Sequence, residues 1–110
     1  MSTSRPNDAD AITDVSVQTE REVDRGWVFE VVVSRGESTA RHDVSLSWVD
    51  YEHWSHGAAA PERVAKAVLE CLLTLDPGRA LPRAFDASTA RRWVAGFDER
   101  LRERLSDGVG

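Results

Sequence analysis

The segment from Pro61 to Leu75 is apolar on every side but one. Its polar residues recur at every fourth position, which places them on one narrow stripe of an α-helix. These residues are Glu62, Lys66, Glu70 and Thr74. Pro61 suits the first turn of such a helix because its missing N–H would have no partner there. The remaining apolar arc is too wide for a sheet alone to bury, so we expect strands and a second helix to cover this helix together.

Three segments that precede this helix alternate apolar and polar residues with the period of two that is typical of β-strands. Val15, Val17, Thr19 and Val23 share one face of the first segment. Trp27, Phe29, Val31 and Val33 share one face of the second, and Val44, Leu46 and Trp48 share one face of the third. Turn-forming residues at 24–26 and 35–38 separate the segments. The pattern therefore predicts a three-stranded antiparallel meander.

The C-terminal part of the sequence predicts a second helix. Asp76-Pro77-Gly78 ends the first helix, and a linker runs from there to Phe85. Asp86 is a good N-cap for a helix that continues to about Leu105. Its apolar stripe is Ala90, Trp93, Val94, Phe97, Leu101 and Leu105, and Asp98 is placed to pair with Arg102 on the exposed side. The predicted fold is α+β, a two-layer βββαα arrangement with both helices on one face of the sheet.

Length and composition limit the classes of function. At 110 residues the chain suits one hydrophobic core, and we predict a flexible tail at 1–11, a single domain at 12–105 and a frayed end at 106–110. The net charge of −5 disfavours binding to nucleic acid and to anionic membranes. No apolar run approaches the length of a membrane span, and the only cysteine, Cys71, gives no disulfide. We expect a cytoplasmic protein.

The sequence contains no motif that specifies a reaction, so we expect no enzyme and no cofactor. Cys71 lies among leucines of the first helix, which predicts a buried thiol that behaves as a small hydrophobic residue. His53 and His56 have a spacing that can present two imidazoles to a metal, with Asp50, Glu52 and His42 nearby in the sequence. A solvated loop after a strand explains the same residues, and we predict no metal site.

Two surfaces are candidates for binding a partner. The outer face of the predicted sheet carries Val28, Val32, Val49 and Tyr51 inside an acidic surround, which is typical of a contact with a protein partner or with a second copy in a homodimer. The alternative is a basic region formed by Arg79, Arg83, Arg91 and Arg92, which suits an anionic ligand or a nucleic acid. Binding to phosphate would weaken steeply with salt, whereas an apolar contact would not. We favour a small non-enzymatic interaction or regulatory module.

Five segments together resemble a group of small bacterial proteins of unknown function. The segments are His42–Leu46, Pro61–Val64, Leu72-Leu73, Phe85-Asp86 and Trp93–Phe97. In that group a short strand pattern is followed by a Leu-rich helix, a Phe-Asp helix start and a final helix rich in aromatic residues. The resemblance covers about two thirds of the chain and implies a bacterial origin and the same architecture, with no catalytic residue to transfer. Ala95-Gly96 departs from the group, where a proline is expected.

Overall fold

The computed structural model describes residues 13–109, with the side chains of 13–106. Three long strands, β1 (Asp14–Val23), β2 (Gly26–Arg35) and β3 (Ser38–Ser47), pair in sequence order and antiparallel. A short fourth strand, β4 (Ala84–Asp86), pairs parallel to β3. The predicted meander is therefore confirmed, and β4 adds to it a strand from within the predicted linker. The predicted tail at 1–11 lies outside the described residues.

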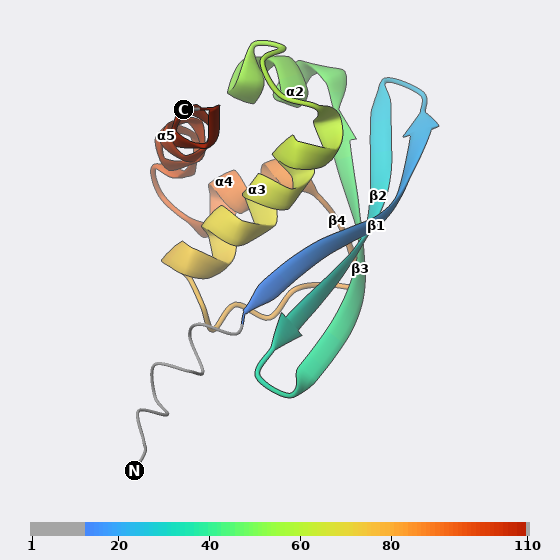
Figure 1. Cartoon of the computed structure of the whole chain (residues 1–110), viewed down its shortest axis with the longest axis vertical. Helices are drawn as coiled ribbons and strands as arrows, with labels where there is room; N and C mark the ends of the chain where they lie inside the picture. The colour runs from blue at the N-terminus through green and yellow to red at the C-terminus, as the bar shows by residue number, and fades with distance from the viewer. Residues whose placement is uncertain (1–12, 110) are drawn as a thin grey trace.

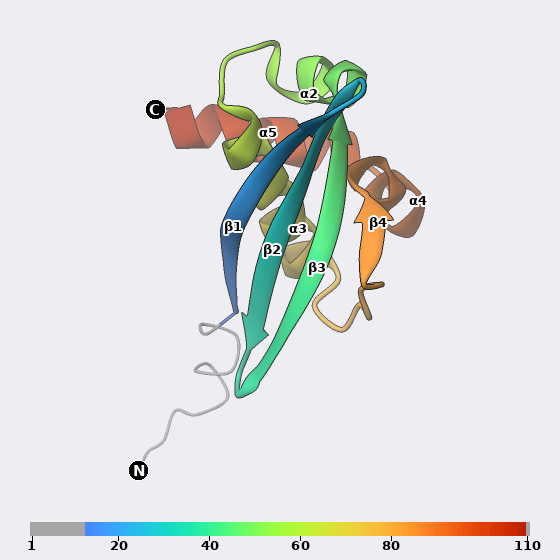
Figure 2. The same cartoon turned by 90° about the vertical axis from the view of Figure 1, so that its right-hand side faces the viewer.

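The helices all lie on one side of this sheet (Figure 1). They are α2 (Trp48–Ser55), α3 (Pro61–Leu75), α4 (Ala90–Trp93) and α5 (Phe97–Val109), with a 3-10 turn η1 (Ala87–Thr89) before α4. Figure 2 looks onto the opposite face of the sheet, where no other part of residues 13–109 covers the strands. The α+β class and the two layers are as predicted, although the helical elements outnumber the two expected. None of the helices within the described residues has the length and apolar content needed to cross a membrane.

Helix α3 has the predicted boundaries and lies at the centre of the core. Pro61 occupies its first turn, and its apolar arc is buried against both the sheet and α5. The core residues from the strands are Val15, Phe29, Val31, Val33, Val44 and Leu46, and those from α5 are Phe97, Leu101 and Leu105. The prediction that strands and a second helix together cover this helix is therefore confirmed.

Strand β1 does not keep one alternation along its whole length. A β-bulge at Gln18 shifts its register with β2, so that Val17 lies opposite Val31 but Thr19 lies opposite Glu30. An extra residue in one strand exchanges the faces of all that follow it. The prediction that Val15, Val17, Thr19 and Val23 share one face was therefore wrong. Val15 and Val17 face the helices, whereas Thr19 and Val23 face the open side of the sheet.

The turn between β1 and β2 requires a glycine at its end. A Cβ atom at Gly26 would lie 2.2 Å from the carbonyl oxygen of Leu46 on β3, which is far inside van der Waals contact. Arg25, just before it, has a positive φ of 69°. The backbone N–H of Trp48 donates to the Arg25 carbonyl at 2.9 Å. This turn therefore holds both the end of β3 and the beginning of α2.

Strand β3 ends earlier than predicted, and α2 begins where the strand was expected to continue. Ser47 caps α2, because its side chain accepts a hydrogen bond from the backbone N–H of Asp50 at 3.0 Å. Trp48, Val49 and Tyr51 consequently lie on a helix, and their assignment to the third strand was wrong. The spacing of Ser47 and Asp50 resembles a capping box, a signal that competes with the alternation of the strand.

The predicted helix from Asp86 to Leu105 is divided into three elements. Asp86 acts as an N-cap, as expected, by accepting from the backbone N–H of Ser88 at 2.9 Å. The chain then leaves helical geometry at Val94, and Gly96 has a φ of 73°, in the region that favours glycine. Helix α5 begins after this break and continues to Val109, beyond the predicted end. The break turns α5 back toward α2 and α3 (Figure 1).

Candidate functional site

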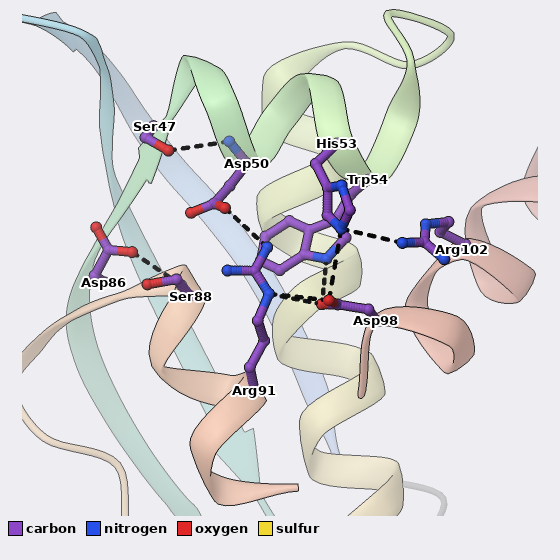
Figure 3. A network of polar contacts seen from close by, with 9 residues as sticks. All are labelled: Ser47, Asp50, His53, Trp54, Asp86, Ser88, Arg91, Asp98 and Arg102. Carbon is purple, nitrogen blue, oxygen red and sulfur yellow. Dashed lines mark hydrogen bonds and ion pairs between the residues drawn. The ribbon is translucent and has the colours of Figure 1, made fainter. Parts of the chain in front are cut away.

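A cluster of charged and aromatic side chains joins α2, α4 and α5 (Figure 3). Arg91 of α4 is at its centre. Its Nε donates to both carboxylate oxygens of Asp98 on α5, at 2.8 and 3.1 Å, and its Nη2 donates to Oδ1 of Asp50 on α2 at 2.8 Å. One guanidinium therefore bridges carboxylates from two other helices. The predicted pair of Asp98 with Arg102 was wrong, because Asp98 faces this cluster.

Trp54 of α2 forms the floor of the cluster. Its ring is buried and lies 4.8 Å from the guanidinium carbon of Arg91, and its indole Nε1 donates to Asp98 at 2.8 Å. Phe97 packs against the same ring edge to face, with the centroids 6.1 Å apart. The guanidinium of Arg91 thus stacks on Trp54 and at the same time forms charge-assisted hydrogen bonds to Asp98.

Arg91 and Asp98 each stabilise the charged form of the other. Burial alone would raise the pKa of Asp98, but hydrogen bonds from Trp54 and Arg91 and the positive charge of Arg91 hold that pKa below its usual range. Burial opposes the charge of Arg91 as well, but its two carboxylate partners raise the pKa of its guanidinium. Both groups are therefore ionised. Together with Asp50 and Trp54 they form a clamp that joins α2, α4 and α5.

Two of the four arginines in the basic region expected at 79–92 are engaged with other side chains. Arg91 is held in the cluster, and Arg79 stacks on Trp93, 4.9 Å from the ring centroid, while its Nε donates to Asp76 at 2.9 Å. Arg83 and Arg92 are exposed. Since two of the four guanidinium groups already have carboxylate partners, the region offers less free positive charge than its sequence indicates.

The open face of the sheet is more polar than expected. Val28 lies between Arg21 and Ser45 of the neighbouring strands, and Val32 lies between Ser16 and Arg41. Glu30 separates the two valines along β2 and forms an ion pair with Arg41. Val28 and Val32 therefore do not form a continuous apolar patch. The other two residues assigned to this face, Val49 and Tyr51, belong to α2 and are not part of it.

Tyr51 and Val49 differ in their surroundings. Tyr51 packs edge to face on Trp27, with the centroids 5.3 Å apart, and its hydroxyl donates to the carbonyl of Ala59. Val49 is 77% exposed, and Trp48 beside it is 50% exposed. These two are the exposed large hydrophobic residues of the part of the chain whose side chains are described, and together they form the Trp48–Val49 patch. The sequence pattern placed Val49 on the outer face of the sheet and Trp48 on the opposite face, with Val44 and Leu46.

The histidines have separate roles. The Nε2 atom of His53 lies 3.5 Å from the Asp98 carboxylate, whereas His56 ends α2 in a left-handed conformation with a φ of 52°. His42 is buried on β3, where its Nδ1 bonds to the carbonyl of Pro82 at 2.7 Å. No three His, Cys, Asp or Glu side chains among the described residues group closely enough to hold a metal ion.

Cys71 is buried in α3, as predicted. Burial raises the pKa of its thiol, and the nearby Arg104 and Arg100 offset this effect only in part. A protonated, inaccessible thiol is a poor nucleophile. Cys71 therefore packs as a small hydrophobic residue of the core.

Comparison of the chain with protein-family models, curated proteins and solved structures gave no significant match. The function of the chain is therefore inferred from its own geometry.

Proposed function

We propose that the chain is a small, non-enzymatic, cytoplasmic interaction module that binds another protein through the Trp48–Val49 patch. The observation that supports this best is the adjacency of two exposed large hydrophobic side chains at the start of α2. Exposed apolar residues that cluster carry a cost in water and mark contact surfaces more often than scattered ones do. Tryptophan is also enriched among the residues that dominate binding energy.

The helix that carries the patch is firmly held. Asp50 and Trp54 join α2 to α4 and α5 through Arg91 and Asp98. Ser47 caps its beginning, and the Trp48 N–H bonds to the turn between β1 and β2. A surface that is already ordered loses little conformational entropy when a partner binds. The clamp thus supports a binding role without taking part in the contact.

The charges around the patch indicate the chemistry of the partner. Asp24 and Glu52 are exposed near Trp48, and so is Arg25, whose carbonyl accepts from the Trp48 N–H. The chain as a whole carries a net charge of −5. From this net charge we infer a partner with an apolar pocket bordered by Lys or Arg. A second copy would carry the same net negative charge, so a different protein is favoured over the homodimer.

The test uses a photo-crosslinking amino acid at position 49 and, as a control, at Thr39, which is exposed at the far end of the sheet. Proteins captured only from position 49 are purified and titrated with the wild-type chain, with W48S and with V32S. We expect W48S to weaken binding by at least about tenfold, since tryptophan hot spots contribute 2 kcal/mol or more, roughly. V32S, which alters the open sheet face, should bind as the wild type does.

Three results would contradict the proposal. The first is capture of the chain itself as the sole product from position 49, which would indicate a homodimer. The second is equal affinity of W48S and the wild type for the captured protein. The third is capture from position 39 with none from position 49, which would move the contact to the open face of the sheet.

A further inference from the structure

A cavity of about 260 Å³ lies between α2, the connector after α2 and the C-terminal half of α5. The residues that line it are Trp54, Ser55, His56, Ala58, Ala59, Arg102, Leu105 and Ser106. His56, Ala58 and Ser106 are exposed, so the cavity is open to solvent. It lies at the opposite end of α2 from Trp48 and Val49.

The lining combines apolar walls with positive charge. Trp54, Leu105 and the alanines supply the walls, and Arg102 supplies a permanent cation. His56 supplies a second group able to carry positive charge. None of the lining residues is acidic, although the chain as a whole has more acidic than basic residues. A cavity of this composition complements an anion that has an apolar body.

Arg102 lines the cavity, and its guanidinium reaches the cluster around Arg91 (Figure 3). Its Nη2 lies 3.0 Å from Nε2 of His53. Because arginine has no acceptor, Nε2 of His53 must accept this hydrogen bond. One Arg102 nitrogen is thus engaged in positioning, and the fork keeps further N–H groups for a ligand.

We propose that this cavity binds a small carboxylate with a compact apolar body, with Arg102 as the group that recognises the carboxylate. A guanidinium matches the geometry of a carboxylate through two parallel hydrogen bonds. The apolar walls would cover a body of the size of one aromatic ring, since an apolar cavity of about 150 Å³ accommodates benzene. The site shares no residue with the Trp48–Val49 patch, so it is independent of the proposed function.

Benzoate is the probe, and uncharged benzamide of the same shape is its control. Binding is followed by the indole N–H signals of the four tryptophans in NMR spectra, each assigned by a Trp→Phe variant. We expect benzoate to shift the Trp54 signal saturably while the Trp48 signal stays in place. Benzamide should bind at least about tenfold more weakly, because it cannot form the charged pair.

The matched variants are R102Q and R92Q. Arg92 is exposed on α4 and does not line the cavity. R102Q should weaken benzoate binding by at least about tenfold, whereas R92Q should leave it unchanged. The proposal is overturned if benzoate causes no saturable shift of Trp54, if benzamide binds equally well, or if R102Q binds benzoate as the wild type does. The comparison of benzoate with benzamide needs no variant and decides the question even where R102Q does not fold.

Discussion

Arg91 lies over the ring of Trp54 while its Nε donates to Asp98, the same carboxylate that accepts from the Trp54 indole. The three side chains come from α4, α2 and α5, so this one cluster of side chains joins three helices. Asp50 completes it and is the more buried of the two carboxylates, with 14% of its side chain exposed. Removal of the guanidinium would leave two partly buried carboxylates with no cation between them.

R91A is therefore expected to lower the free energy of unfolding by about 1.5–3 kcal/mol, the range for hydrogen bonds to charged groups. R92A, which removes an exposed arginine from the next position, should change it by less than about 0.5 kcal/mol. Urea unfolding followed by circular dichroism measures both. Equal stability of the two variants would show that the cluster contributes little to the fold.

The stability of the chain should fall in acid through Asp98. The pKa of this carboxyl is lowered in the folded state, so the folded chain binds a proton less readily than the unfolded chain does. The resulting stabilisation is complete above the ordinary aspartate value of about 4 and is lost as the pH falls through the lower folded-state pKa. D98N should remove this contribution. Unfolding measured from pH 7 downward should show the stabilities of the two proteins converging only as the pH falls below the folded-state pKa of Asp98.

Two glycines offer a matched test of the backbone. A Cβ atom at Gly26 would collide with the Leu46 carbonyl oxygen, whereas a Cβ atom at Gly78 would meet nothing within 4 Å. G26A should destabilise the fold by about 2–3 kcal/mol through forced displacement of β3. G78A should change stability by less than about 0.5 kcal/mol. Thermal unfolding of both variants measures the difference, and a neutral G26A would refute the close approach.

Cys71 should react with thiol reagents only when the chain unfolds. It is 4% exposed, and burial raises the pKa of its thiol. Labelling by a disulfide reagent under native conditions should therefore proceed at a small fraction of the rate measured in denaturant. The urea dependence of labelling should match that of unfolding. Rapid labelling of the native protein would contradict the burial of this part of α3.

The elements that were predictable from sequence are those whose residue pattern repeats over a long segment. Strand β2 and helix α3 are the clearest cases, since each presents one period without interruption. Strand β4 has three residues, too few for a period to be detected. The bulge at Gln18 leaves the sequence alternation intact while it reverses the faces beyond it. Local pattern alone cannot reveal such an inserted residue, because the partner strand defines it.

The candidate sites were less predictable than the fold. Arg91 and Asp50 are 41 positions apart, so their pairing depends entirely on how the helices pack. The sequence placed Arg91 in an anion-binding region because its partners were not evident. Trp48 was assigned to the third strand because β-strand alternation outweighed the cap formed by Ser47. The cavity beside Arg102 forms because α5 turns back toward α2. The sequence pattern predicted one unbroken helix and therefore did not reveal this turn.

That turn at Gly96 has a consequence for any attempt to stabilise the chain. An unbroken helix would place Asp98 about 10 Å along the axis from Arg91, since each residue rises 1.5 Å, roughly. The direct bonds between the two side chains would then be out of reach. Replacing Val94–Gly96 with strong helix formers would make the C-terminal segment more helical on its own and would separate the charges that fasten it to the rest. In this chain, weak helical propensity at one position is a condition for strong tertiary contact at another.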